Sequence, residues 1–162
     1  MKKSKIYLDT SVINFLFAED APEKKEATHD LFDNFIKTRV YETYVSDFVL
    51  QEIEQTTDQD KKTRLIETID KYFIDLVELT DFTEINQLAS AYLESAIPKN
   101  KLFDALHIAC AVVNSIDYLV SWNYKHLANV NREKKIISIN LSKNYSQPFR
   151  IITPFELLDY GN

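Results

Sequence analysis

The sequence predicts an α/β fold in which a mostly parallel β-sheet is covered by helices on both faces. Short apolar runs alternate along the chain with longer stretches in which apolar residues recur at helical spacing. No repeat, low-complexity tract or Pro/Gly-rich linker interrupts the 162 residues, so we expect one domain spanning residues 1–162. With 45% hydrophobic and 27% charged residues, the chain has the composition of a globular protein that buries a core.

The predicted strands are short runs of β-branched, aromatic and other apolar residues, as in strands buried within a parallel sheet. They lie at Lys5–Leu8, Tyr41–Val45, Ile74–Leu79, Tyr118–Val120 and Arg150–Ile152. Strands that alternate with helices are joined by right-handed crossovers, which place the helices on both faces of the sheet.

The predicted helices carry apolar residues three and four positions apart, and capping residues or proline mark several of their ends. They cover Val12–Phe17, Glu23–Thr38, a segment capped by Ser46 or Asp47, Asp60–Phe73, a segment from the cap candidates Thr80–Glu84 to about Ala96, Leu102–Asn114, a short segment at Tyr124–Asn129, and a terminal helix that Pro154 opens. The pattern of Lys134–Leu141 is compatible with a helix or a strand.

Four oxygen-bearing side chains follow the predicted strands or open the helices behind them. Asp9 comes directly after the first strand, and Asn123 follows Tyr118–Val120 closely. Glu52 lies on the first turns of the helix after the second strand, and Asp104 lies in the opening turn of an apolar helix. Ligands of parallel sheets bind beyond the carboxyl ends of the strands, so we expect these four side chains to converge there.

Each of these residues also has a plain structural interpretation, as a helix cap or a solvated side chain, because the chain holds 25 Asp and Glu residues. Asp104 is the sharpest signal, since a carboxylate in an apolar helix costs free energy unless it is paired, hydrogen-bonded or bound to metal. Clustered carboxylates repel one another, and oxygen ligands select Mg²⁺ or Mn²⁺ over Zn²⁺. The acids together predict a cation site that can polarise a phosphodiester and activate water.

The composition excludes several other chemistries. A single glycine, Gly161, rules out glycine-rich phosphate loops, and a single cysteine, Cys110, rules out an internal disulfide or a cysteine-based zinc site. With a net charge of −6, a polyanionic substrate requires a local basic rim or bound cations. The chain begins without the apolar run of a signal peptide and has no stretch of about 20 apolar residues, so we expect a cytoplasmic protein with no membrane association.

Several short motifs occur in an order that is typical of one protein family. They are Tyr7–Ile13, Ser46–Ile53, Lys101–Ala109, Leu119–Asn123 and Ile151–Leu157. Each motif is weak alone, but their order and spacing cover nearly the whole chain. In these motifs the chain resembles the PIN-domain nucleases, and within them the small single-domain proteins similar to VapC-type toxins of bacterial toxin–antitoxin pairs.

This resemblance implies a three-layer α/β/α sandwich and Mg²⁺- or Mn²⁺-dependent cleavage of RNA. The metal-holding acids of the family fall on Asp9, Glu52 and Asp104, with a fourth catalytic position at Asn123. Many relatives carry Asp at that fourth position, so Asn123 is a departure that supplies an oxygen without a charge and would weaken a second metal most. The toxin relatives are usually held inactive by a small antitoxin and often dimerise, so these are the expected protein partners.

The candidates for substrate binding are hydroxyls beside the first acid and cations that flank the later motifs. They are Thr10, Ser11, Lys101 and Lys125. The two hydroxyls have helix capping as their alternative role, and the lysines have a solvated surface. We expect His107 to be a packed, hydrogen-bonded histidine rather than a general base, and Trp122 to lie in the core rather than stack on a base.

Three functions compete. The first is a metal-dependent endoribonuclease. The second is a weakly active or inactive module of the same fold that binds RNA or protein, which Asn123 and the acidic charge favour. The third is a receiver-like or phosphatase-like domain with a phosphoaccepting Asp9, which ranks lowest because Ser11 stands where a phosphatase of this kind has a second acid.

Overall fold

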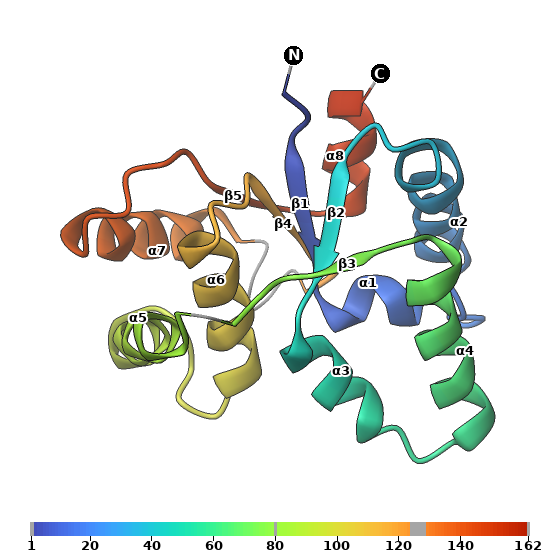
Figure 1. Cartoon of the computed structure of the whole chain (residues 1–162), viewed down its shortest axis with the longest axis horizontal. Helices are drawn as coiled ribbons and strands as arrows, with labels where there is room; N and C mark the ends of the chain where they lie inside the picture. The colour runs from blue at the N-terminus through green and yellow to red at the C-terminus, as the bar shows by residue number, and fades with distance from the viewer. Residues whose placement is uncertain (1, 80, 124–128, 162) are drawn as a thin grey trace.

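The computed structural model describes residues 2–79, 81–123 and 129–161. Five parallel strands form one sheet in the order β3-β2-β1-β4-β5, with helices on both sides (Figure 1). The strands are β1 (Lys5–Leu8), β2 (Glu42–Val45), β3 (Asp75–Leu76), β4 (Tyr118–Val120) and β5 (Arg150–Ile152). The predicted three-layer α/β/α sandwich with a mostly parallel sheet is therefore confirmed.

The helices form the two outer layers. They are α1 (Thr10–Phe15), α2 (Pro22–Leu31), α3 (Asp47–Glu54), α4 (Gln59–Lys71), α5 (Phe82–Ser95), α6 (Leu102–Val113), α7 (Val130–Ser142) and α8 (Pro154–Gly161). Figure 1 shows α5, α6 and α7 on one side of the sheet and α2, α4 and α8 on the other. Contacts of α6 with α5 and of α8 with α2 hold each layer together.

Two segments differ clearly from the sequence prediction, and one that the prediction left open is settled. The strand predicted at Ile74–Leu79 is reduced to β3, because only two residues pair at the exposed edge of the sheet. The helix predicted at Glu23–Thr38 is α2 followed by a π-helical turn, η1 (Phe32–Ile36), closed by the bond from Lys37 N–H to the carbonyl of Phe32 (2.8 Å). The undecided Lys134–Leu141 is helical within α7. Thr80 and most of the short helix predicted at Tyr124–Asn129 lie outside the described residues.

Four helical segments end on a residue in the left-handed backbone region, where glycine is usual. Because the only glycine of the chain is Gly161, other residues occupy these positions. They are Arg39 (φ 59°), Phe73 (φ 54°), Ser115 (φ 57°) and Asn144 (φ 70°). At each, the next N–H bonds a carbonyl five residues earlier, as in a Schellman motif; Ile74 N–H to the carbonyl of Ile69 (3.1 Å) is one example.

The core surrounds the two central strands. Ile6, Tyr7 and Leu8 of β1 are buried, as are Leu119 and Val120 of β4, because helices cover both faces of the sheet. Residues 105–112 of α6 are also buried, which explains why that helix is so apolar. Among the described residues, no helix combines the length and the apolarity that crossing a membrane requires.

Candidate active site

The pairing of β1 with β4 brings two distant segments together at the carboxyl edge of the sheet. Leu8 lies opposite Val120, so Asp9 and Ser121 are neighbours although 112 positions separate them. The backbone N–H of Asp9 donates to the carbonyl of Val120 (3.2 Å), which extends the ladder by one bond. The two residues that follow the central strands thus start the candidate site.

The predicted acids surround one cavity of about 290 Å³ at this edge. Asp9 enters from the end of β1, Glu52 from α3 and Asp104 from the first turn of α6. Asn123, after β4, completes the set of four that the sequence predicts to converge. The wall also includes Thr10, Ser11 and His107, together with Asn14 and Gln55, which the sequence analysis did not single out.

Asp9 is a buried carboxylate, 4% exposed, that two serine hydroxyls hold. Ser11 Oγ donates to Oδ1 (2.5 Å) and Ser121 Oγ donates to Oδ2 (2.6 Å). Burial raises the pKa of Asp9, and the charge of Asp104 adds to that rise, whereas His107 and the two hydroxyls oppose it. Asp9 occupies the N-cap position of α1 but its side chain makes no capping hydrogen bond, so helix capping does not explain this residue.

Each serine is oriented by a backbone N–H of the segment after β4. Trp122 N–H donates to Ser11 Oγ (3.0 Å), and Asn123 N–H donates to Ser121 Oγ (2.9 Å). A hydroxyl that accepts in this way directs its own proton elsewhere, here to Asp9. Ser121 carries no local sequence signal for this role, since only the register of β1 against β4 shows that its hydroxyl reaches Asp9.

Glu52 is held from two sides at one oxygen. Thr10 Oγ1 donates to Oε1 (2.7 Å), and His107 Nε2 lies 2.5 Å from the same atom. Burial opposes ionisation of Glu52, but the hydrogen bond and charge of His107, with the Thr10 hydroxyl, lower its pKa overall. The side chain is 29% exposed, so Glu52 is neither a free surface acid nor a core residue.

A buried hydrogen-bonded chain fixes His107 behind Glu52. Tyr7 Oη lies 2.6 Å from His107 Nδ1 and 2.5 Å from Ser46 Oγ, and Ser46 caps α3 by accepting from Phe48 N–H (3.2 Å). Burial raises the pKa of Tyr7 well above 10, so the phenol keeps its proton and can donate it to Nδ1. Because ionised Glu52 can only accept a hydrogen bond, His107 Nε2–H donates to it whether the ring is neutral or charged. The expectation that His107 is packed and hydrogen-bonded is confirmed.

The donor chemistry of the cavity suits a hard divalent cation. Its carboxylates and amide are oxygen donors, and both nitrogens of His107 are engaged by Tyr7 and Glu52. Within the described ranges, no three His, Cys, Asp or Glu side chains are arranged to hold an ion together. Mg²⁺ requires only one or two carboxylates when waters and phosphate complete its shell, so these residues fit Mg²⁺ or Mn²⁺.

Among the described residues, Lys101 and Trp122 do not line this cavity. Lys101 precedes α6 and does not contribute to the cavity wall, and Lys125 lies outside the described residues. Trp122 is buried, its Nε1 donates to Thr28 Oγ1 (2.9 Å), and its ring meets Phe155 edge-on at 4.9 Å. The expectation that Trp122 is a core residue is confirmed.

The fold and the site define a parallel α/β protein with an acidic cavity at the carboxyl edge of its central strands. The PIN-domain family model matches residues 6–132, and the chain therefore belongs to the PIN-domain family. PIN domains are generally nucleases, so a nucleic acid is the class of substrate that this membership indicates. The matched segment contains all four predicted site residues. No curated protein matches the chain.

Proposed function

We propose that this protein is an Mg²⁺- or Mn²⁺-dependent endoribonuclease that hydrolyses RNA phosphodiesters at the cavity around Asp9. The proposal rests on one observation: three carboxylates from three separate elements line one cavity, in a chain that belongs to a nuclease family. The charge of Asp104 adds to the cost of ionising Asp9, and a divalent cation near the two carboxylates would offset that repulsion.

In this proposal Asp9 and Asp104 would hold the cation directly, Glu52 is the third metal-site acid and would act through a bound water, and Asn123 is the fourth catalytic position. The bound ion supplies Lewis-acid polarisation of the phosphodiester and activation of a water molecule. The two serine hydroxyls favour the ionised form of Asp9 against its burial and fix the direction of its carboxylate. Glu52, whose pKa is lowered, stays ionised at neutral pH and can orient a water through its carboxylate. No nucleophilic side chain is required.

The substrate-binding roles follow from the hydrogen bonds. Thr10 and Ser11 donate to Glu52 and Asp9, which supports a role in orienting the two acids rather than in capping α1. Lys101 and Lys125 remain the candidates for contacts with RNA phosphates, because they flank two of the motifs in sequence.

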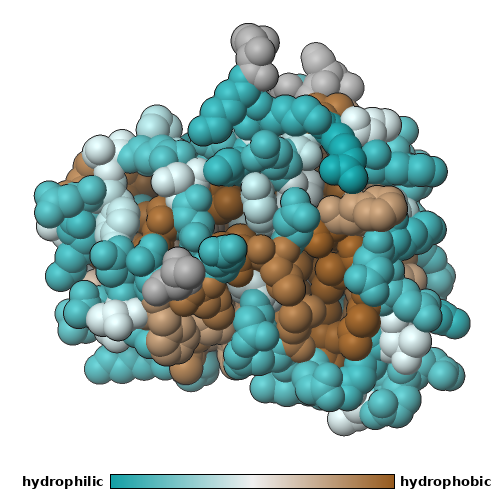
Figure 2. Space-filling model, viewed as in Figure 1, coloured by the Kyte–Doolittle hydropathy of each residue, from teal (hydrophilic) through white to brown (hydrophobic). Residues whose placement is uncertain are grey.

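We further propose that the chain belongs to the VapC-like subgroup, as the toxin of a toxin–antitoxin pair, and that residues 1–162 form a single domain. The single-domain proposal is supported by β5, which lies beyond the matched segment and pairs with β4 in the same sheet. A small antitoxin or a second copy of the chain would cover apolar surface. Ile66, Leu76 and Phe82 expose 40–54% of their area, and Figure 2 shows apolar surface over β3 and between α3 and α4.

The decisive experiment is RNA cleavage by the purified protein in Mg²⁺, in Mn²⁺ and in chelator. Asp104→Ala and Asp9→Asn are compared with the wild type, and Asp159→Asn, an exposed acid on α8, serves as the matched control. We expect cleavage only with the cation, lost in the first two variants and kept in the control. Identical products in every lane would exclude the proposed mechanism.

A second candidate function is a PIN-fold module that binds RNA or protein without efficient cleavage. The observation that favours it is Asn123, a neutral residue at the cavity wall where many relatives carry an acid. The same variants separate the two functions. Growth inhibition or RNA retention that survives Asp9→Asn at normal protein levels supports the binding module and not the nuclease.

A further inference from the structure

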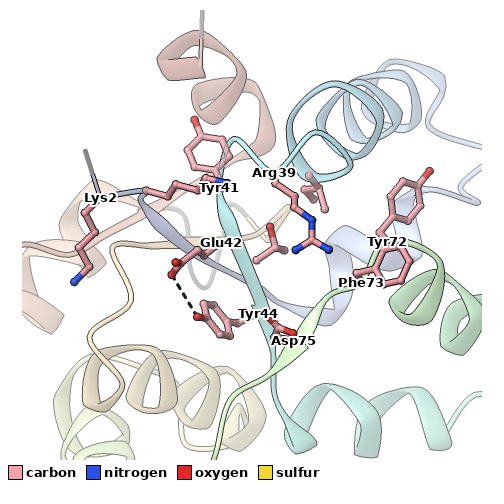
Figure 3. Close-up of a pocket in the computed structure, with 11 residues that line it drawn as sticks. Lys2, Arg39, Tyr41, Glu42, Tyr44, Tyr72, Phe73 and Asp75 are labelled. Atoms are coloured by element: carbon pink, nitrogen blue, oxygen red, sulfur yellow. Dashed lines mark hydrogen bonds between the residues drawn. The ribbon is translucent and has the colours of Figure 1, made fainter.

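A second pocket lies at the opposite end of the sheet from the candidate active site. Its volume is about 470 Å³, and it shares no lining residue with the acidic cavity (Figure 3). Lys2 and Lys3 precede β1 at its rim, whereas Asp9 follows the other end of that strand. Pockets of 300–1,000 Å³ are typical of sites for small ligands, so this one has room for a molecule of nucleotide size.

The pocket differs in charge from the chain as a whole. Lys2, Lys3 and Arg39 contribute three cations, and Glu42 and Asp75 contribute two acids. The acidic cavity, by contrast, is lined by three carboxylates, and the chain carries a net charge of −6. An anionic group is therefore better accommodated at this end of the sheet than at the other.

Aromatic rings make up much of the wall. Tyr41 and Tyr44 come from the segment around β2, and Tyr72 and Phe73 come from the end of α4. Phe73 is 73% exposed, although such a ring is usually buried, and the Arg39 guanidinium lies 5.7 Å from its centroid. Figure 3 shows the Arg39 guanidinium reaching over the pocket toward Phe73. A planar ring can stack on both groups.

The hydroxyl of Thr43 lies behind this wall. Thr43 is 7% exposed, and its Oγ1 has no hydrogen-bond partner among the described residues. Because that oxygen exposes almost no surface, a molecule in the pocket does not reach it, and the assignment rests on the charged and aromatic groups of the wall.

We propose that this pocket binds a nucleotide whose base carries an exocyclic amino group. The base stacks against Phe73 and Arg39, its amino group donates to the carboxylate of Glu42 or Asp75, and its phosphate lies toward Lys2 and Lys3. The free nucleotide and a nucleotide within an RNA strand offer the same chemistry. The site is separate from the proposed cleavage site and does not depend on it.

The test is calorimetric titration of the full chain carrying Asp9→Asn, in chelator, with AMP as the probe. Both conditions silence the proposed nuclease, so a failure of that function leaves this measurement intact. We expect AMP to bind and UMP, which lacks the amino group, to bind more weakly. Binding of a short oligoadenylate without binding of AMP identifies an RNA strand as the source of the nucleotide and also supports the site.

The left-handed backbone at two wall residues provides variants that should fold. Arg39→Gly and Phe73→Gly place glycine where the backbone favours it while they remove the stacking groups. Each should weaken AMP binding by roughly tenfold or more. Ser115→Gly makes the same change at a left-handed helix end outside this pocket and should leave binding unchanged.

Three results would overturn the proposal. The first is the absence of binding by both AMP and oligoadenylate. The second is equal binding of AMP by Arg39→Gly, Phe73→Gly and the parent protein. The third is that inorganic phosphate binds as tightly as AMP does, because the aromatic wall would then contribute nothing to the affinity.

Discussion

Replacing Ser121 by alanine tests the physical core of the candidate site without touching any proposed metal ligand. The change removes the hydroxyl that donates to Asp9 Oδ2 at 2.6 Å, and it also deprives Asn123 N–H of its acceptor. A hydrogen bond to a charged group is worth about 1.5–3 kcal/mol. A chain of this size loses about 2–4 °C in Tm per kcal/mol, so we expect a fall of roughly 3–12 °C at pH 8 in chelator.

The loss of stability caused by Ser121→Ala should be larger at high pH than at low pH. The Ser121 hydroxyl stabilises the ionised form of Asp9, so its loss raises the pKa of Asp9 further. The penalty is therefore full where Asp9 is ionised and shrinks as acid protonates it. Thermal melts at pH 8 and at pH 4 measure this difference.

Ser142→Ala is the matched control for this prediction, because Ser142 is an exposed serine on α7 whose hydroxyl bonds only the carbonyl of Ile139. It should change the free energy of unfolding by less than about 0.5 kcal/mol. If Ser121→Ala melts like Ser142→Ala at pH 8, or if its penalty is as large in acid, the hydroxyl does not support an ionised Asp9 and the reasoning is wrong.

Three further predictions concern the same network and the helix ends. Asp9→Asn in chelator should be at least as stable as the wild type at pH 7. Burial raises the pKa of Asp9, so the wild type loses stability as pH rises from about 3.9 through that raised value. In thermal melts the advantage of the variant should vanish toward pH 4, and a variant less stable than the wild type at pH 7 would contradict the prediction. Tyr7→Phe removes the hydroxyl that is hydrogen-bonded to His107 Nδ1, and it should lower kcat for RNA cleavage about 10–100-fold with KM unchanged. Tyr41→Phe is the control and should leave kcat unchanged, because the Tyr41 hydroxyl makes only a long 3.5 Å bond outside the site. Ser115→Gly should raise the free energy of unfolding by about 0.5–1 kcal/mol in urea titrations. Ser115 has a left-handed backbone conformation, which glycine adopts without strain. A lower free energy of unfolding in the variant would refute this explanation.

The sequence predicts the bounds of three of the five described strands, for a physical reason. The predicted bounds of Lys5–Leu8, Tyr118–Val120 and Arg150–Ile152 coincide with β1, β4 and β5, because strands covered on both faces are continuous apolar runs. The edge strand β3 is overestimated, since Ile74 and Val77 are buried for packing reasons although they lie outside the two paired residues. Burial and pairing therefore coincide in β1, β4 and β5 and separate at β3.

The acids of the site are also predictable, whereas the groups that hold them are not. Ligands of parallel sheets bind beyond the carboxyl ends of the strands, and the three acids Asp9, Glu52 and Asp104 lie at such strand ends or at the starts of the helices that follow. Ser121 reaches Asp9 across 112 positions, and Tyr7 reaches His107 across 100. These contacts depend on strand register and on how α6 lies against β1, and neither follows from local sequence patterns.

The two best-defined carboxylates of the site differ in a way that bears on their roles. Burial raises the pKa of Asp9, while His107 and Thr10 lower that of Glu52. Environments that separate the pKa values of neighbouring acids commonly assign them different tasks. Of the two, Asp9 gains more from a cation, because a positive charge compensates its burial, and it is therefore better suited than Glu52 to hold the ion. Glu52 is ionised without that help, so it can orient a water before any metal arrives. Removing the cation should accordingly change the protonation of Asp9 far more than that of Glu52.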